Sequence, residues 1–324
     1  MNQSKLLCID MHNLLHKTFY VHQTEDFDML VKLAFHATFT TLNKYYKLHK
    51  PDKLICVFDR PNWRVDYTKS PDCYSSRLYK GTRRLVMTQK QTKMYELFKQ
   101  FIIDFEDLIR THTAIVCLAK DKLEADDLIA GLCYIYGGND VGTNNKSTYE
   151  ADIFNDIPHD IVIVSADKDL LQLLRYENVI LIDPATGKPR TLEKWNHDVD
   201  YFLYEKSLTG DAGDNVQSAL PRLRKKKIFE AYNDEYEHTN LMQRTWINEN
   251  EREMNVGVLV KENMLLTNLT HQPEHIQSLI WEAIAHEMNN RGKYSHFHFL
   301  KFLGKYELKN VSKSLDQFIP MLSK

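Results

Sequence analysis

The chain has 324 residues, 43% of them hydrophobic, and a formal net charge of −2. This length predicts two domains, or one large core with an appendage. An apolar run of about 18 residues is missing, which argues against a membrane-spanning helix, and Met1 is not followed by the pattern of a signal peptide. The five cysteines form no C-x-x-C pair, so we expect reduced thiols in a cytoplasmic protein. The near-neutral charge argues against a protein that coats nucleic acid.

Five short apolar runs have the length and composition of buried strands in a mostly parallel sheet. In chain order they are Leu6–Ile9, Leu54–Phe58, Ala114–Leu118, Ile161–Val164 and Val179–Ile182. Amphipathic helical patterns lie between them, the clearest from about residue 91 to residue 109, and another begins near residue 125. Strands that alternate with helices predict an α/β fold, in which helices flank a central sheet.

Three further stretches complete the outline of the chain. Residues 60–79 contain two prolines, and we expect little regular structure there. Residues 137–159 are rich in Gly, Asn, Asp and Thr and indicate a long loop or insertion. After about residue 183 the strand signals fade and the pattern is mainly helical. We therefore predict an α/β domain over residues 1–183 and a helical C-terminal domain over residues 184–324.

Acidic residues follow three of the predicted strands. Asp10 ends the first strand, Asp59 ends the second, and Asp167 and Asp169 follow the fourth. In open α/β sheets, ligands bind outside the carboxyl ends of the strands. The sequence therefore predicts that these carboxylates meet at one edge of the sheet.

Five further acids occur in two short motifs. Glu124, Asp126 and Asp127 lie within four residues at the start of a predicted helix, where capping needs only one acid. Asp211 and Asp214 are three residues apart, a spacing that places both side chains on one face of a helical turn. Taken singly, each acid is also explained as a cap or a solvated surface charge.

Convergence of all nine acids would require cations. Each pair of like charges at about 4 Å costs roughly 4 kcal/mol at an effective dielectric constant near 20. Ligation by oxygen alone favours Mg²⁺ or Mn²⁺ over zinc. Two such ions activate a water molecule and stabilise the leaving oxygen at a phosphodiester bond.

These motifs together resemble the 5′-nuclease superfamily, which includes flap endonucleases and the 5′-exonuclease domains of bacterial DNA polymerases. Within it the similarity is to the ribonuclease H group of T-even-type bacteriophages. The segments that carry the resemblance lie in family order across about residues 5–230 and are residues 8–10, 57–59, 78–83, 123–130, 165–169 and 209–216. The resemblance implies a 5′-nuclease or PIN-like fold with a basic arch or clamp at about residues 60–95. The helical C-terminal domain would complete the metal site and contact duplex DNA.

The resemblance also implies roles for individual residues, with two Mg²⁺ ions as cofactors and Mn²⁺ able to substitute. The first ion would be held by Asp10, Asp59, Glu124, Asp126 and Asp127, the second by Asp169, Asp211 and Asp214, with Asp167 between them. The catalytic residues would be Asp10, Asp59, Asp126, Asp167, Lys80 and Arg83, the last two facing the scissile phosphate. Because Lys80 and Arg83 are three residues apart, we expect them to share a helix face. Tyr79 would stack on a base, and Arg84 would contact the nucleic acid.

A second basic cluster departs from the family pattern. Its members are Arg222, Arg224, Lys225, Lys226 and Lys227. Many relatives have a glycine-rich helix-hairpin-helix here, whereas residues 217–227 of this chain contain no glycine, which makes a tight nest of backbone N–H groups doubtful. Contact of these side chains with duplex phosphate and a solvated charge run are equally compatible with the sequence. For His12 and His16, packing near the site is favoured over metal binding.

The function implied by the resemblance is that of a metal-dependent 5′-to-3′ exonuclease and flap endonuclease of the RNase H type. It would remove RNA primers and 5′ flaps during DNA replication. Expected partners are DNA and RNA–DNA duplexes with 5′ ends or flaps, and further candidates are a single-stranded-DNA-binding protein or a sliding clamp. We expect a monomer in the cytoplasm, that of the host if the protein is phage-encoded. Two alternatives are a non-catalytic DNA-structure-binding protein and a single-strand ribonuclease with a PIN-like acidic core.

Overall fold

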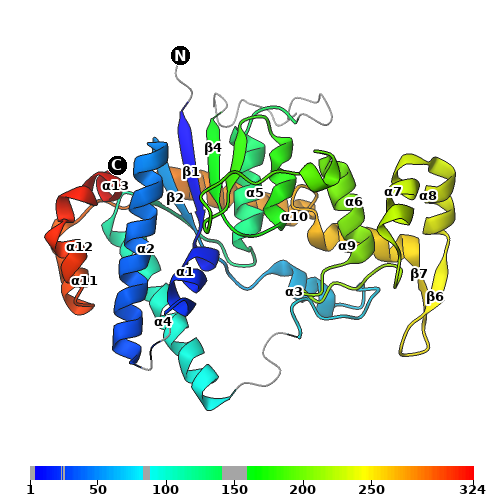
Figure 1. Cartoon of the computed structure of the whole chain (residues 1–324), viewed down its shortest axis with the longest axis horizontal. Helices are drawn as coiled ribbons and strands as arrows, with labels where there is room; N and C mark the ends of the chain where they lie inside the picture. Colours follow the sequence, from blue (N-terminus) through cyan, green and yellow to red (C-terminus); the bar gives the residue numbers. More distant parts are fainter. Residues whose placement is uncertain (1–3, 23, 25, 83–87, 141–158) are drawn as a thin grey trace. The chain divides into compact units, whose positions relative to one another are not determined.

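The chain forms two compact units in a computed structural model (Figure 1). The structure describes residues 4–22, 24, 26–82, 88–140 and 159–324. Unit 1 comprises Met1–Arg60, Met87–Arg190 and Gln277–Lys324, and unit 2 comprises Pro61–Val86 and Thr191–Ile276. Neither unit is a continuous stretch of chain, so the single boundary predicted near residue 183 does not describe how the chain is divided.

Unit 1 is built on a five-stranded parallel sheet with the strand order β3-β2-β1-β4-β5. Its strands are β1 (Lys5–Asp10), β2 (Lys53–Val57), β3 (Val116–Leu118), β4 (Asp160–Val164) and β5 (Val179–Ile182). All five lie where the apolar runs predict them. The chain places β2 and β3 on one side of β1 and then returns to the other side with β4. Ligands of open α/β sheets bind at such a reversal of strand order, which here lies at the carboxyl ends of β1 and β4.

Helices cover both faces of this sheet. On one face, α1 (Met11–Tyr20), α2 (Phe27–His49) and α4 (Gln89–His112) share a core with strand residues such as Leu7 and Ile9. On the other face, α5 (Ala125–Tyr136) contacts β1, β2 and β4. Neighbouring strand residues point to opposite faces, which explains why the strands are apolar throughout.

The last helices of the chain return to unit 1. They are α10 (Glu274–Asn289), α11 (His296–Lys305), α12 (Lys309–Lys313), the 3₁₀ turn η3 (Leu315–Gln317) and α13 (Ile319–Ser323). Phe299, Leu303 and Met321 are buried in the same core as α2 and α4. Burial of these side chains is the physical reason that residues 277–324 belong to the sheet-containing unit. Within the described part of the chain, no helix is both long and apolar enough to cross a membrane.

Unit 2 is mainly helical, as the sequence predicts for most of this region. Its elements are α3 (Trp63–Lys69), η2 (Glu193–Trp195), α6 (Val199–Thr209), α7 (Lys225–Asn233), α8 (Glu235–Met242), β6 (Thr245–Ile247), β7 (Glu253–Asn255) and α9 (Val256–Thr267). Two features differ from the sequence-based expectation. Strands β6 and β7 form an antiparallel hairpin, and α3 begins within residues 60–79, where its N-cap Asn62 accepts a hydrogen bond from the Val65 amide. Most of the predicted insertion at residues 137–159 lies outside the described residues.

Candidate active site

Asp10 lies at the junction of β1 and α1, where the structure buries it almost completely. Its side chain is the N-cap of α1 and accepts a hydrogen bond from the Asn13 amide at 3.0 Å. The second carboxylate oxygen accepts a hydrogen bond from Ser165 Oγ at 2.8 Å, and Ser165 directly follows β4. Capping and strand-end position are therefore combined in one residue, and the carboxylate is fixed between β1 and β4.

Asp59 follows β2 and connects it to the start of α5. Its Oδ1 accepts a hydrogen bond from the Ala125 amide, the first residue of α5, at 2.7 Å. The backbone N–H of Asp59 donates to His12 Nδ1 at 3.0 Å. Since this ring nitrogen accepts a hydrogen bond, it is not available to a metal ion, which supports the packing role expected for His12.

The three acids at the start of α5 have different partners. Asp127 is fully buried, and its Oδ2 accepts a hydrogen bond from the Glu124 amide at 3.2 Å. Its carboxylate therefore stabilises the N-terminus of α5, where backbone N–H groups favour negative charge. Asp126, between these two residues, carries a charge that interacts with those of Asp10, Asp59 and Asp167.

The loop after β4 is held by hydrogen bonds from several directions. Asp167 donates its backbone N–H to Ser165 Oγ at 3.0 Å, and its Oδ1 accepts from the Asp169 amide at 2.8 Å. Arg190 donates from Nη1 to the carbonyl oxygens of Ala166 and Asp167, at 2.8 and 2.6 Å. Asp169 opens the 3₁₀ helix η1 (Asp169–Arg175). The carboxylate of Asp167 is thus fixed beside that of Asp10.

Mutual repulsion shows which acids form one cluster. The pKa of Asp10 is raised to about 7, first by burial and then by the nearby charges of Asp59 and Asp167, while the hydrogen bonds from Asn13 and Ser165 lower it. Burial also raises the pKa of Asp126 well above its usual value, with added repulsion from Asp167, Asp10, Glu124 and Asp59. These five carboxylates come together at the carboxyl edge of the sheet, where ionisation of all of them requires bound cations.

The chemistry of the cluster fits a hard divalent cation. The atoms of the cluster that can bind a metal ion are carboxylate oxygens. The nearby His12 Nδ1 is not available as a ligand, because it accepts a hydrogen bond from the Asp59 amide. The thiols of Cys8 and Cys56 are buried, and burial raises their pKa values. Oxygen donors of this kind suit Mg²⁺ or Mn²⁺. Among the described residues, no three His, Cys, Asp or Glu side chains are already arranged as the ligands of a metal ion. Binding would therefore draw the carboxylates of this cluster closer together.

The remaining two acids belong to unit 2 and lie in a turn. Asp211 Oδ1 accepts hydrogen bonds from the amides of Gly213 and Asp214, at 2.8 and 3.2 Å, and Asp211 pairs with Val216 in an isolated bridge. The helical turn expected for this pair is therefore wrong. Burial acts to raise the pKa of Asp211, but Lys206, whose Nζ is 3.2 Å from Oδ2, and the amides of Asp214 and Gly213 together outweigh burial and lower this pKa.

Lys80 lies in a turn of unit 2 and not on a helix. Its φ is +55°, its amide donates to the Asp214 carbonyl at 2.8 Å, and its Nζ is 4.0 Å from Asp214 Oδ1. The predicted helix face shared with Arg83 is thus wrong at Lys80, and Arg83 and Arg84 lie outside the described residues.

Tyr79 supports this turn from the inside. Its ring is only 7% exposed, it packs with Val216 and Leu266, and its hydroxyl donates to Asp214 Oδ2 at 2.8 Å. The predicted stacking of Tyr79 on a base does not fit this burial. The side chain instead holds the segment that carries Lys80 against the turn that carries Asp214.

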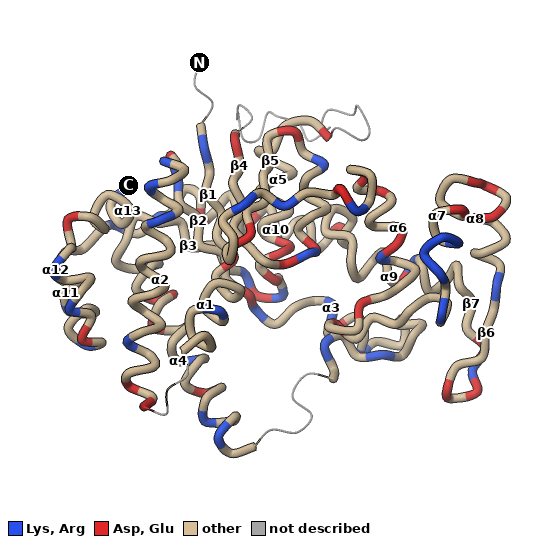
Figure 2. Tube along the Cα trace, viewed as in Figure 1, with Lys and Arg blue, Asp and Glu red and all other residues tan. Residues whose placement is uncertain are grey.

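The second basic cluster leads into α7, as the blue stretch at the start of this helix shows (Figure 2). All five of its basic residues are exposed. Lys225 pairs with Glu205 at 2.7 Å, and Lys227 pairs with Glu230 at 2.6 Å. The pair of Lys227 with Glu230 is the more exposed of the two and is weak, so both expected roles of the cluster are compatible with the structure.

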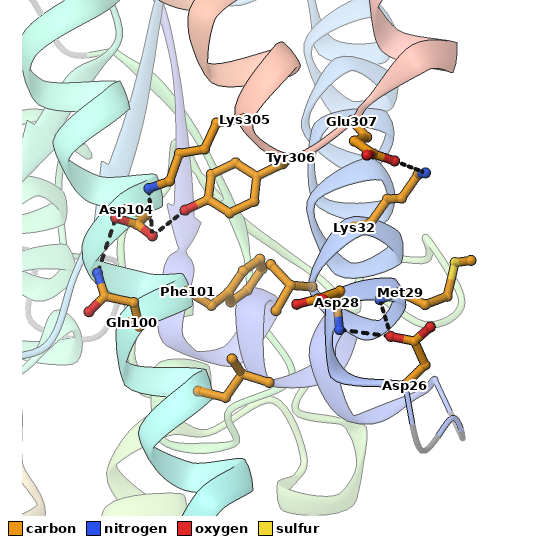
Figure 3. A pocket seen from close by; sticks show the side chains of 12 residues that line it. Asp26, Asp28, Met29, Lys32, Gln100, Phe101, Asp104, Lys305, Tyr306 and Glu307 are labelled. Atoms are coloured by element: carbon orange, nitrogen blue, oxygen red, sulfur yellow. Dashed lines mark hydrogen bonds and ion pairs between the residues drawn. The ribbon is translucent and has the colours of Figure 1, made fainter.

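Unit 1 also contains a cavity of about 660 Å³ between α2, α4 and α11, and several acids line it (Figure 3). Two of these acids have a lysine as a neighbour. Asp104 accepts hydrogen bonds from Tyr306 and from Lys305, whose Nζ is 3.4 Å away, and Glu307 pairs with Lys32 at 3.2 Å. Asp104 and Glu307 therefore differ from the carboxylates around Asp10, which repel one another.

Comparison with known proteins decides the family. Residues 5–200 match the model of the 5′-3′ exonuclease N-terminal resolvase-like domain. The chain belongs to this 5′-nuclease family. It is 27% identical to the ribonuclease H of Enterobacteria phage T4 over 267 residues, which are 79% of this chain and 75% of that protein. It is 31% identical to DNA polymerase I of Rhizobium leguminosarum over 149 residues, which are 43% of this chain and 12% of the polymerase.

Solved structures confirm the fold of the 5′-nuclease. A bacteriophage T5 protein crystallised with metal ions has a TM-score of 0.60 at 17% identity, covering 88% of this chain and 99% of that one. A bacteriophage T5 flap endonuclease in complex with DNA and metal ions has a TM-score of 0.59 at 16% identity, covering 97% and 99%. The predicted family, α/β fold and phosphodiester-hydrolase activity are confirmed.

Several positioning residues of the 5′-nuclease were not predicted from the sequence. Ser165 contacts the carboxylate of Asp10 and the amide of Asp167, and Asn13 Oδ1 accepts the Ala166 amide at 3.2 Å. Arg190 holds the same loop through two carbonyl oxygens. The sequence contains one indication of a role for Ser165, because this residue lies between a strand and the acidic pair that follows. It contains no indication for Arg190, because only the folded chain brings this residue to the loop.

Proposed function

We propose that this 5′-nuclease removes RNA primers and 5′ flaps during replication, with two Mg²⁺ ions as cofactors and Mn²⁺ able to substitute. The observation that carries the proposal is the group of like charges that the half-buried Asp126 and Asp167 form with the buried Asp10. Carboxylates in such a place are stable as anions only with cations between them. Bound there, the ions would supply an activated water and stabilise the leaving oxygen.

The residues of unit 1 divide into ligands and supports in this proposal. Asp10, Asp126 and Asp167 bind cations directly, and Glu124 and Asp59 contribute negative charge beside them. Ser165, Asn13 and Arg190 fix the orientation of the carboxylates through the hydrogen bonds described above. We assign Asp127 to the helix terminus first, because its oxygen already accepts a backbone amide. Asp169 is proposed as a ligand of the second ion.

The residues of unit 2 are proposed to act on the substrate and on the second ion. Lys80 offsets negative charge that develops on the scissile phosphate, and Asp211 and Asp214 contribute to the second metal site. The basic cluster that leads into α7 contacts duplex phosphate. RNA–DNA and flapped substrates are supported by the names of relatives, a ribonuclease H and a flap endonuclease crystallised with DNA.

A cleavage assay tests the proposal. Purified protein is incubated with 5′-labelled flap, nicked and RNA–DNA substrates, with Mg²⁺ or with a chelator. We expect short products from the 5′ ends only when Mg²⁺ is present. Asp126→Asn and Asp167→Asn should each lower the rate by about a hundredfold or more, the size seen when one electrostatic contact to a transition state is lost. Lys80→Met should lower kcat more than it weakens binding.

The matched control is Asp121→Asn, an exposed acid that shortly precedes α5. It carries the same change of charge outside the cluster and should cleave like the unmodified protein. Full activity of Asp167→Asn, or cleavage that persists in chelator, would contradict the proposed site.

A further inference from the structure

Unit 2 contains a polar pocket of about 540 Å³ that the acidic cluster does not use. Three segments line it. They are residues 75–78, which lead into Lys80; Asn215 and Gln217, which follow Asp214; and residues 248–250 with Arg252, at the tip of the hairpin β6–β7 (Figure 1). Two of these segments thus adjoin the residues that we propose to act on the substrate.

The lining has the donors that a nucleotide needs. Arg77 and Arg252 bring guanidinium groups, Ser75 and Ser76 bring hydroxyls, and carboxamides come from the asparagine and glutamine residues. The carboxamides are those of Asn215, Gln217, Asn248 and Asn250. Guanidinium and hydroxyl groups suit phosphate oxygens, and carboxamides suit the hydrogen-bonding edges of bases. None of the described residues that line the pocket is aromatic, so the proposed binding rests on hydrogen bonds and charge.

Contacts from several segments of unit 2 hold the walls of the pocket in place. Glu262, on α9, is 5% exposed and accepts hydrogen bonds from the amides of Tyr74 and of Ser75, the latter at 2.9 Å. Asn215 donates from Nδ2 to the Leu78 carbonyl at 2.9 Å. Arg252 lies 4.7 Å from the centre of the Tyr74 ring and donates to Ser76 Oγ at 3.2 Å. The pocket is therefore formed before any ligand arrives.

We propose that this pocket binds one unpaired nucleotide in the single-stranded 5′ arm of the substrate. The inference rests on the proposed function and adds a binding subsite to it. A nucleotide in a duplex has its base edge already paired, whereas an unpaired one offers phosphate and base edge together. The pocket offers partners for both, and its size lies in the range of about 300–1,000 Å³ typical of small-ligand sites.

Glu249 competes with the ligand for Arg77. It is the acidic residue in the lining, its side chain is 78% exposed, and its Oε1 is 3.4 Å from Arg77 Nη2. Exposed ion pairs of this kind are weak, so a phosphate can displace the carboxylate. Removal of the Glu249 charge should therefore strengthen binding of the 5′ arm, an effect that a purely structural role for this residue would not produce.

Binding in chelator tests the inference without any contribution from cleavage. Affinity is measured for one duplex that carries a single-stranded 5′ arm and for the same duplex with only a nick. Arg77→Ala should raise the Kd for the armed duplex about tenfold, the size of one hydrogen bond to a charged group. It should reduce the slope of log K against log salt by about 0.7. Binding of the nicked duplex should not change, and Glu249→Gln should tighten binding of the armed duplex alone.

Arg244→Ala is the matched control, because Arg244 is an exposed arginine just before β6 whose side chain is outside the pocket. It should bind both duplexes like the unmodified protein. An unchanged Kd for the armed duplex in Arg77→Ala, or an equal loss on both duplexes, would overturn the inference.

The two proposals fail in different ways. If the protein cleaves flaps with Mg²⁺ but Arg77→Ala binds the arm normally, only the pocket inference is wrong. If Arg77→Ala loses the arm selectively but the protein cleaves nothing, the pocket stands and the proposed function is wrong.

Discussion

At the scale of single residues, Asp10 has both a structural role and a proposed role in metal binding. It ends the central strand, caps the first helix and accepts a hydrogen bond from Ser165. Its burial and its neighbours Asp59 and Asp167 make its negative charge unfavourable. The fold therefore stores an electrostatic cost at this position, and a cation that binds the carboxylates would relieve it.

This cost predicts an unusual dependence of stability on pH in the metal-free protein. The pKa of Asp10 is near 4 in the unfolded chain and about 7 in the fold. Below about pH 4 the carboxyl group is protonated in both states and costs nothing. As pH rises from about 4 to 7, the unfolded state releases the proton first, so the free energy of unfolding falls by an amount on the order of a few kcal/mol.

Thermal melting in chelator at about pH 5 and about pH 8 measures this effect. Asp10→Asn keeps the side-chain oxygen that caps α1 but cannot ionise. It should therefore raise the melting temperature more at the higher pH than at the lower, whereas Asp121→Asn should shift it equally at both. If Asp10→Asn raises the melting temperature no more at the higher pH than at the lower, the ionised carboxylate of Asp10 is not the source of this loss of stability.

At this scale the sequence predicts part of the site and misses the rest for identifiable reasons. Asp10, Asp59 and Asp167 were found because a strand end fixes where the next side chain lies. The burial of Tyr79 and the positive φ of Lys80 were not found. Both depend on the contact with Asp214, which is distant in sequence and leaves no local pattern.

Among the elements, the pair α5 and α10 shows how tightly unit 1 is packed. A Cβ atom at Gly131 of α5 would lie 2.2 Å from Ile280 Cγ2 and 2.9 Å from Ile284 Cδ1 of α10. The glycine is therefore required by the close approach of two helices. Since α5 begins at the acidic cluster, this packing also fixes the helix that carries Asp126.

Gly131→Ala should destabilise the protein by about 1–3 kcal/mol, the usual cost of overpacking a well-packed core. The control is Gly304→Ala in α11, where the added Cβ would meet no atom within 4 Å. It should stabilise the protein by about 0.5–1 kcal/mol, because alanine loses less backbone entropy in a helix. Urea unfolding of both variants gives the comparison, and equal effects would contradict the assigned packing.

Element prediction succeeded where long-range context matters least. The strands of the central sheet are apolar on both faces, so their sequences alone mark them. Helix α3 was missed because it is short and lies among prolines and polar residues. The turn at Asp211 was mistaken for helix because a spacing of three residues fits both structures, and the hydrogen bond from Gly213 to Asp211 decides between them.

In the whole molecule, the end of the chain belongs to the unit that contains the sheet. Phe299 of α11 is fully buried, and its ring lies 5.5 Å from that of Phe39 on α2. The sequence predicted that residues 184–324 are mainly helical, but it could not show which helices return to the sheet. An apolar face is visible in a sequence, whereas the surface that covers it is a property of the complete fold.

Phe299→Ala should therefore lower the free energy of unfolding of the sheet-containing unit by about 3–5 kcal/mol. Phe297, two residues earlier and 70% exposed, is the matched control, and Phe297→Ala should have little effect. Urea unfolding followed by circular dichroism gives both values. Equal losses in the two variants would show that the C-terminal helices are not part of the core.

The central claim is that carboxylates from distant parts of the chain hold divalent cations at the carboxyl edge of the sheet. A crystal grown with Mn²⁺ and measured for anomalous scattering tests it most directly. We predict anomalous peaks bound by oxygens of Asp10, Asp126 and Asp167. Peaks confined to other acids, such as the lysine-paired Asp104 and Glu307, or no peak among these three carboxylates, would contradict the claim.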